Sequence, residues 1–211
     1  MTIVQFEPEP AAAAEIFGER LELAREFTAH LAKWGEELGL IGPLELPRLW
    51  TRHVLNSGLV APLLWPEATV GDIGSGAGLP GLVLAIARPD VQMVLIEPME
   101  RRVDWLTAES ERLALENVTV LRARAEDVSL PRPLDQVTAR AVSALSKLIP
   151  ITAPLLRYGG EMLFMKGERV QAELDAAAKV IRKAHLVNTE ILVLGDGLVP
   201  EVTRVFRATV D

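Results

Sequence analysis

The chain has 211 residues, of which 49% are hydrophobic and 24% are charged, and its formal net charge is −7. These values predict one globular domain, with or without an extension, that is large enough to bury a core. The absence of cysteine excludes disulfides, thiolate metal sites and enzymes that add a cysteine to a pyrimidine ring, while the acidic balance disfavours indiscriminate binding to nucleic acid.

The first part of the chain predicts helices. Apolar residues recur in steps of three and four over residues 16–38, which is typical of an amphipathic helix, and the glycines and proline that follow end it. A second helix is expected from Pro47 to about Leu64, because proline suits a first helical position. We therefore expect residues 1–66 to form an N-terminal helical extension.

From Thr69 onward, strands alternate with helices, which predicts a parallel sheet. The strands are expected at residues 69–73, 91–97, 118–122, 136–139, 161–165, 186–194 and 204–210. Helices are expected after the first, second, fourth and fifth strands, and Tyr158-Gly159-Gly160 is expected to be a turn. The last two strands are predicted to form an antiparallel pair. The fold class is therefore α/β: a Rossmann-like, seven-stranded, mostly parallel sheet with helices on both faces, spanning residues 67–211 and typical of a class I methyltransferase.

A glycine-rich turn follows the first strand, in the sequence Val70-Gly-Asp-Ile-Gly-Ser-Gly-Ala-Gly-Leu-Pro-Gly81. The spacing Asp72-x-Gly74-x-Gly76-x-Gly78 is typical of loops that hold S-adenosylmethionine, because a Cβ would collide with the approaching cofactor. The same segment also fits the dinucleotide pattern G-x-G-x-x-G. A carboxylate at Asp72 would repel a pyrophosphate but attract the ammonium of a methionine, so the sequence favours S-adenosylmethionine over a dinucleotide or a plain turn.

Ligands of open α/β sheets bind at the carboxyl ends of the strands. Glu97 ends the second strand and is expected to take both hydroxyls of a ribose, although a pair with Arg101 is the alternative. Ala125-Glu126-Asp127, after the third strand, is expected to meet an adenine. A helix cap or solvated turn is the alternative, more for Asp127 than for Glu126. Arg140 ends the fourth strand and is expected to face the site, with an ion pair to Glu126 or Asp72 as the alternative.

The fourth strand lacks the Asn/Asp-Pro-Pro-aromatic motif that grips exocyclic amines, since it ends in Thr138-Ala139-Arg140-Ala141. A ring nitrogen with a free lone pair, such as guanine N7, is therefore the favoured nucleophile. Such a reaction needs alignment and electrostatics rather than a general base. Arg140 and Lys166 are the candidate catalytic residues, as donors to guanine O6 that also counter charge on the base.

Basic residues predict a local RNA-binding face despite the acidic total. Arg48, Arg52 and Asn56 recur every four residues and would share one helix face, with His53 beside them. Arg101, Arg102, Arg140 and Lys166 would complete the patch. A solvated helix face is the alternative for Arg48 and Arg101.

No apolar run approaches the roughly 20 residues that span a bilayer, and residues 1–10 lack the basic start and apolar stretch of a signal peptide. We expect a cytoplasmic protein without membrane contact. We also expect no metal site, since no cluster with ligand spacing is evident, and a monomer.

The chain resembles the GidB/RsmG family, the bacterial methyltransferases that modify N7 of one guanine in 16S ribosomal RNA of the small subunit. From about Trp34 onward the resemblance rests on these segments: Leu49-Trp-Thr-Arg-His-Val-Leu-Asn-Ser57, Asp72–Gly81, Glu97 with Arg101-Arg-Val103, Ala125-Glu126, Ala139-Arg-Ala141 and Met165-Lys-Gly167.

The resemblance implies S-adenosylmethionine as cofactor and 16S ribosomal RNA, or the small subunit, as partner. It places cofactor contacts on Gly74, Leu79, Ala125, Glu126 and Arg140, and supports RNA contacts by Arg52, His53 and Lys166. Ala139 and Met165 depart mildly from the family pattern. Methylation of a small molecule, and a catalytically silent ribosome-assembly factor, remain the alternatives.

Overall fold

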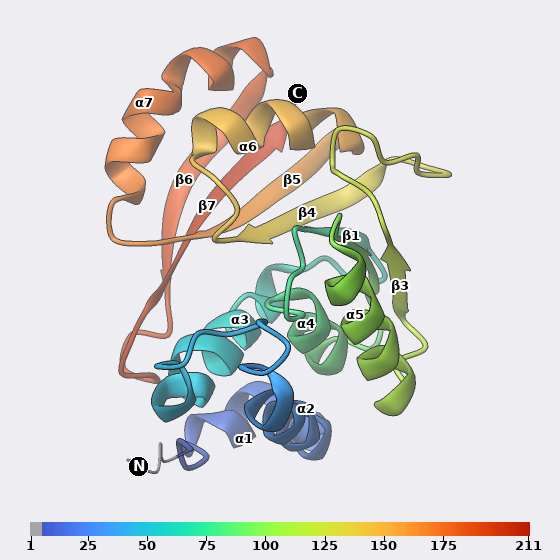
Figure 1. Cartoon of the computed structure of the whole chain (residues 1–211). Coiled ribbons are helices and arrows are strands. Elements are labelled where there is room, and N and C mark those ends of the chain that lie inside the picture. The colour runs from blue at the N-terminus through green and yellow to red at the C-terminus, as the bar shows by residue number, and fades with distance from the viewer. Residues whose placement is uncertain (1–5) are drawn as a thin grey trace.

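The computed structural model describes residues 6–211 as a seven-stranded sheet with helices on both faces (Figure 1). The strand order is β3-β2-β1-β4-β5-β7-β6. Strands β1 to β5 pair in parallel, whereas β7 is antiparallel to both β5 and β6. The strands are β1 Thr69–Ile73, β2 Gln92–Ile96, β3 Val118–Leu121, β4 Leu134–Arg140, β5 Leu156–Lys166, β6 Leu186–Leu194 and β7 Thr203–Val210. The predicted fold class is confirmed.

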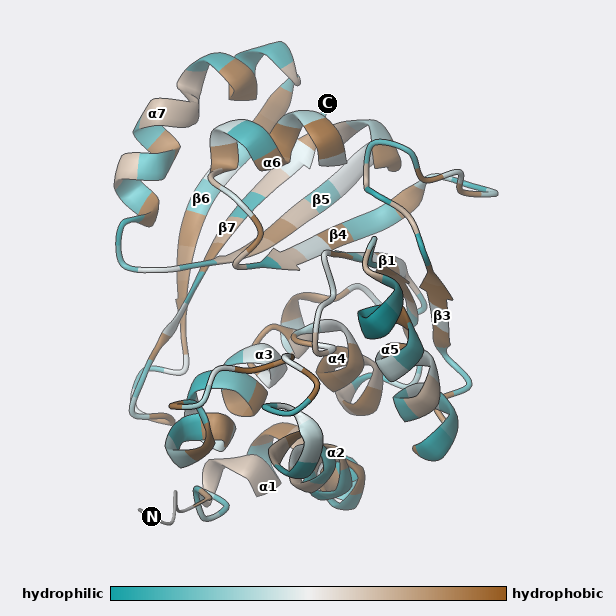
Figure 2. Cartoon of the chain, viewed as in Figure 1, coloured by the Kyte–Doolittle hydropathy of each residue, from teal (hydrophilic) through white to brown (hydrophobic). Residues whose placement is uncertain are grey.

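Two groups of helices cover the two faces of the sheet. One face carries α1 Ala12–Phe17, α2 Leu21–Trp34, α3 Asn56–Gly58, α4 Gly81–Ala87 and α5 Glu100–Arg112. The other carries α6 Leu145–Thr152 and α7 Val170–Lys183. In Figure 2, α7 alternates between hydrophilic and hydrophobic residues along its length, as expected for a helix with one solvated side, whereas α4 is hydrophobic almost throughout.

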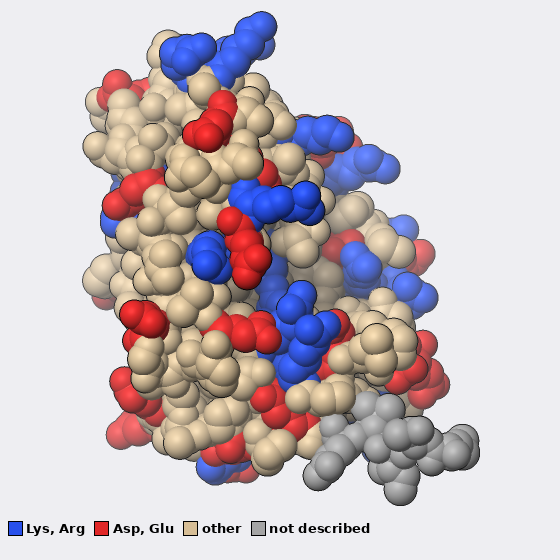
Figure 3. Space-filling model, turned by 90° about the vertical axis from the view of Figure 1, so that its left-hand side faces the viewer, with Lys and Arg blue, Asp and Glu red and all other residues tan. Residues whose placement is uncertain are grey.

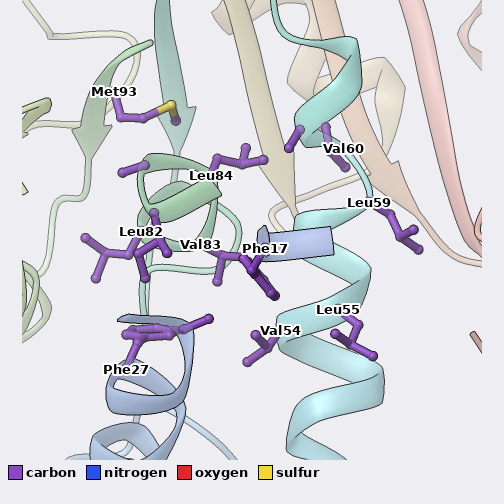
Figure 4. Packing of buried hydrophobic residues seen from close by; sticks show 14 of the residues in the cluster. Phe17, Phe27, Val54, Leu55, Leu59, Val60, Leu82, Val83, Leu84 and Met93 are labelled. Atoms are coloured by element: carbon purple, nitrogen blue, oxygen red, sulfur yellow. The ribbon is translucent and has the colours of Figure 1, made fainter. Parts of the chain in front are cut away.

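Helix α4 is apolar on all sides because it lies between the sheet and the N-terminal helices. Phe17, Phe27 and Val54 belong to the same buried cluster as Leu82 and Leu84 of α4 (Figure 4). The predicted boundary at residue 66 falls between the short 3-10 helix η4 (Ala61–Leu63) and β1. Side chains from both sides of that boundary therefore share one hydrophobic core.

The two long helices predicted for the N-terminal part are each broken into shorter pieces, so those predictions are wrong in detail. α1 ends before Gly18, which has a φ of 49° and is the first residue of the 3-10 helix η1 (Gly18–Arg20). α2 follows and ends at Trp34. Residues 46–63 form the 3-10 helix η2 (Leu46–Arg48), the π-helix η3 (Leu49–Leu55), α3 and η4.

The turn predicted at Tyr158-Gly159-Gly160 is also wrong, because β5 runs through it. The glycine at 159 has a φ of 72°, and the register of β4 with β5 shifts between Leu134 and Gln136. The glycines thus allow a β-bulge instead of a chain reversal. The helix after β4 is predicted to run through Leu156, but α6 ends at Thr152, and the 3-10 helix η5 (Ala153–Leu155) leads into β5.

Gly81, the first residue of α4, has no room for a side chain. A Cβ there would contact Leu95 and would lie 2.5 Å from Oδ2 of Asp72. We expect Gly81→Ala to lower the free energy of unfolding by about 1–3 kcal/mol, as overpacked cores do. Urea denaturation followed by circular dichroism measures this. Gly167→Ala, where a Cβ meets nothing within 4 Å, is the control, and an equal effect of both substitutions would contradict the expectation.

Candidate active site

A crevice of about 600 Å³ opens at the carboxyl ends of β1 to β4. Its wall includes the glycine turn after β1, the end of β2, the segment after β3 and the end of β4. The N-terminal part of the chain closes one side through Leu40–Gly42, Glu45 and His53. Both the sheet and the preceding helices therefore build the crevice.

The glycine turn has the backbone shape that its sequence predicts. Gly74, Gly76 and Gly78 have φ values of 69°, 55° and 91°, a region that side chains rarely adopt. Gly74 and Gly76 line the crevice together with Leu79, whereas Gly78 lies outside its lining, against Leu82. At Gly76 the nearest atom to an added Cβ is 3.7 Å away, so this residue keeps an open side.

Asp72 lies below the glycine turn and outside the crevice lining. Its side chain is fully buried, and Oδ2 accepts a hydrogen bond of 3.0 Å from the backbone N–H of Gly81, at the start of α4. Oδ1 has no hydrogen-bond partner among residues 6–211. The expected contact with a cofactor ammonium would require this carboxylate to turn, and it stays a prediction.

Burial raises the pKa of Asp72 to about 7, against 3.8 for an ordinary carboxyl. Between these pH values the folded protein holds a proton that the unfolded chain has lost, so Asp72 makes the free energy of unfolding fall as pH rises from about 4 to 7. We expect Asp72→Asn to remove this loss, which is at most roughly 1 kcal/mol for each pH unit. Urea denaturation of both proteins at several pH values checks this, and a difference between them that does not change with pH would contradict it.

Glu97 follows the last residue of β2 and reaches the crevice from its floor. Its side chain is 2% exposed, and its two carboxylate oxygens accept hydrogen bonds from the backbone N–H of Gly76, at 2.9 Å, and of Met99, at 3.0 Å. The alternative pair with Arg101 is wrong, since the nearest guanidinium is that of Arg102, at 3.8 Å. Each oxygen keeps a lone pair, so Glu97 can accept two hydroxyls from the crevice.

Ala125 and Glu126 also line the crevice, as expected for residues that follow β3. Ala125 is buried and Glu126 is exposed. Arg140 lines the crevice from the end of β4, but it does not pair with Glu126 or Asp72, so that alternative is wrong.

The guanidinium of Arg140 instead donates to residues of the π-helix η3 and to Ser57 of α3. Its acceptors are the carbonyl oxygens of Arg52 and His53, at 3.0 and 3.3 Å, Nδ1 of His53 at 2.7 Å, and Oγ of Ser57 at 3.4 Å. Burial lowers the pKa of Arg140 to about 10, with a further contribution from the charge of Arg52. Arg140 therefore remains a cation at neutral pH.

A second hollow, a groove of about 1190 Å³, adjoins the crevice and shares Arg140, Ala141 and Val142 with it. Figure 3 shows the side of the molecule that bears the groove, where Lys and Arg side chains alternate with Asp and Glu around a hollow. The cations that line the groove are Arg52, Arg140, Lys166, Arg169 and Arg204, and its acids are Glu168, Glu173 and Glu201.

Lys166 lies at the end of β5, in the wall of this groove. Its side chain is 9% exposed, and Nζ donates to the carbonyl oxygen of Ser143 at 2.6 Å and pairs with Glu173 at 2.8 Å. An ammonium has three N–H groups, so one remains for a ligand.

The structure brings together only part of the predicted RNA-binding patch. Arg52 lines the groove, whereas His53 lines the crevice and its side chain is only 13% exposed. Arg101 lies apart from both, against Gly39 and in a separate hollow between α2 and α5. Arg48 forms an ion pair with Glu45 at 2.8 Å.

Sequence reasoning missed Arg169, Arg204, Glu173 and Glu45. Arg204 could have been found, because the antiparallel pairing of β5 with β7 places it opposite Lys166. Glu45 precedes the broken helix, and no periodic pattern links it to the site. Among residues 6–211, no group of His, Asp and Glu has the arrangement of a metal site, and no helix is long and apolar enough to cross a membrane.

A parallel sheet edged by an antiparallel pair, with a glycine turn after β1 and an acid after β2, defines a Rossmann-like class I methyltransferase fold. The chain belongs to the GidB family: the model of this family, described as rRNA small subunit methyltransferase G, matches residues 20–199.

Relatives of nearly the same length carry that description. The chain is 67% identical to ribosomal RNA small subunit methyltransferase G of Leifsonia xyli subsp. xyli, over 97% of both chains. It is 66% identical to the protein of the same name from Clavibacter michiganensis subsp. michiganensis, over 97% of this chain and 96% of that one.

Solved structures agree in fold. A SAM-dependent methyltransferase from Aquifex aeolicus matches with a TM-score of 0.61 and 17% identity, over 82% of this chain and 98% of that one. TYW2 of M. jannaschii, in complex with AdoMet, matches with a TM-score of 0.57 and 19% identity, over 74% of each chain. At these identities the likeness concerns the fold alone.

Proposed function

We propose that this protein transfers a methyl group from S-adenosylmethionine to N7 of a guanine in 16S ribosomal RNA of the small subunit. The observation that carries the proposal is that Arg140, Ala141 and Val142 line both a cofactor-sized crevice and a groove with cations in its wall, so the two hollows adjoin. The family match and the names of the relatives support RNA of the small ribosomal subunit as substrate. Neither a small-molecule methyltransferase nor a silent assembly factor is favoured by these relatives.

The residues of the crevice fit S-adenosylmethionine. Glu97 offers two acceptor oxygens on the crevice floor for the ribose hydroxyls. The turn at Gly74 and Gly76 would lie along the methionine part, and Ala125-Glu126 along the adenine. When bound, the cofactor supplies an electrophilic methyl group on a sulfonium. We assign this chemistry to residues 67–211, with residues 1–66 completing the crevice wall.

Lys166 is better placed than Arg140 to donate to guanine O6. The four N–H groups on the terminal nitrogens of Arg140 face four acceptors from residues 52–57, so they are occupied by the protein itself. Lys166 keeps one N–H free in the groove. A hydrogen bond from Lys166 to O6 would hold the ring in line with the methyl group. Its positive charge would not counter the positive charge that develops on the base as N7 is alkylated, so its proposed role is to orient the guanine.

Glu173, beside Lys166 in the groove wall, would favour guanine over adenine as the base bound there. Its carboxylate lies 2.8 Å from Nζ of Lys166, so a donor and an acceptor stand side by side in the groove wall. Guanine presents the matching acceptor O6 beside the donor N1–H, whereas adenine presents a donor where guanine has O6. We propose that this pair reads the base.

RNA would dock through the groove cations, which offset the net charge of −7 locally. Binding of this kind weakens as salt is added, because each phosphate contact releases counterions. We further propose that the protein acts as a monomer in the cytoplasm, and light scattering should give a mass near 23.0 kDa.

Methyl transfer to purified small subunits and to free 16S ribosomal RNA tests the proposal. We expect isotopically labelled methyl from S-adenosylmethionine to enter the RNA, and mass mapping to place it on N7 of one guanine. Large-subunit RNA is the control and should stay unlabelled. Label in metabolites only would favour the small-molecule alternative, and failure to bind the cofactor in calorimetry would favour an assembly factor.

A further inference from the structure

Arg140, His53 and Glu45 form a chain of side-chain contacts at the wall between the crevice and the groove. Arg140 donates to Nδ1 of His53 at 2.7 Å, and Nε2 of the same imidazole lies 2.5 Å from a carboxylate oxygen of Glu45. His53 and Glu45 line the crevice, and Arg140 lines both hollows. The imidazole is therefore occupied on both nitrogens and is not free to contact RNA.

The hydrogen-bond donors in this series of contacts determine which ring nitrogen of His53 carries the proton. A guanidinium only donates, so Nδ1 must carry a lone pair and no proton. Nε2 must then carry the proton of the neutral ring, and it donates this proton to Glu45. Burial and the charge of Arg140 lower the pKa of His53 to about 4, which agrees with a neutral imidazole; Arg52 adds to this effect and Glu45 opposes it.

The π-helix η3 supplies further hydrogen-bond acceptors for Arg140. Carbonyl oxygens of Arg52 and His53 accept from the guanidinium as well, so η3 offers three acceptors within two residues. Mid-chain π-turns are frequent at functional sites. Arg140 thus joins the end of β4 to the N-terminal helices at the position where the two hollows meet.

We propose that His53 is a positioning residue: its neutral imidazole, held in the Nε2–H form by Glu45, fixes the side chain of Arg140 in the wall between the cofactor crevice and the RNA groove. This inference rests on the proposed function for the meaning of the two hollows. Glu45 acts through His53 and touches neither ligand in this scheme. The residues that the two hollows share then keep their positions, so that the methyl group and the base meet in line where the hollows join.

Two substitutions separate the roles of the two ring nitrogens. The amide of Asn lies as many bonds from Cα as Nδ1 does, so His53→Asn keeps an acceptor for Arg140. The amide of Gln matches Nε2, so His53→Gln keeps a donor for Glu45 but loses the acceptor for Arg140. We expect kcat for methyl transfer to fall about tenfold to a hundredfold further in His53→Gln than in His53→Asn, as expected for loss of a hydrogen bond to a charged group.

The exposed His185 is the matched control, since it has a φ of 51° that asparagine tolerates, and His185→Asn should keep full activity. Thermal unfolding of all three variants confirms that each is folded. Equal activity of His53→Asn and His53→Gln would overturn the proposal.

A second measurement does not depend on activity. Nitrogen-15 spectra of the three histidines, assigned with the His53→Asn variant, report which ring nitrogen carries the proton. We expect His53 to show a protonated Nε2 and a bare Nδ1 from pH 8 down to about pH 5. A proton on Nδ1, or a charged ring at pH 7, would overturn the inference. A protein that kept this tautomer but methylated no RNA would overturn the proposed function alone.

Discussion

Replacing Lys166 with methionine should lower the rate of methyl transfer to RNA about a hundredfold or more and leave the affinity for S-adenosylmethionine nearly unchanged. Lys166 lines the groove and lies outside the lining of the crevice. Loss of the donor that orients the base costs about a hundredfold in rate, since misplacing a reacting atom by about 1 Å has an effect of that size. Single-turnover methylation of small subunits measures the rate, and calorimetry measures the affinity.

Two further variants test whether the lower rate comes only from a structural disturbance at Glu173 or from the loss of a lysine. Lys166→Met leaves Glu173 without its 2.8 Å partner, so Lys166→Met combined with Glu173→Gln removes the unpaired charge. Lys179→Met, on the exposed side of α7, is the control for removal of a lysine and should be fully active. If the double variant regained the wild-type rate, Lys166 would have no part in catalysis.

Replacing Glu97 with glutamine should weaken S-adenosylmethionine binding by about tenfold to a hundredfold. The carboxylate accepts N–H groups from both sides, at Gly76 and Met99, and an amide must turn its NH2 group toward one of these donors. A buried hydrogen bond to a charged group is worth about 1.5–3 kcal/mol, which corresponds to this change in affinity. Calorimetry with S-adenosylmethionine measures it.

Glu100→Gln is the matched control, because Glu100 is an exposed acid three residues away that pairs with Arg122 on the surface. It should bind the cofactor as the unchanged protein does. A Glu97→Gln variant that bound with full affinity would show that the ribose hydroxyls lie elsewhere.

The parts that the sequence predicted well are those where neighbouring residues decide the structure. The glycine turn needs positive φ at Gly74, Gly76 and Gly78, and glycine spacing alone predicts it. Glu97 and Arg140 could be placed because parallel strands end at a common edge, so each strand's last residues meet there.

The parts that could not be predicted depend on contacts between distant segments. The acceptors of Arg140 precede it by 83 to 88 residues, and they exist because residues 49–55 form a π-helix that helical periodicity does not reveal. The pair of Lys166 with Glu173 likewise depends on how α7 packs on the sheet. For the same reason the sequence could not show that Arg101 lies against Gly39, apart from the groove.

The decisive experiment is a crystal structure with S-adenosylhomocysteine and a guanosine nucleotide bound. We expect the ribose hydroxyls on Glu97 and the sulfur beside Arg140, Ala141 and Val142, where the two hollows join. Guanine N7 should lie in line with the position of the methyl group, with O6 at Lys166. A crevice that held a dinucleotide, or a nucleoside that bound with its sulfur turned away from the groove, would contradict this expectation.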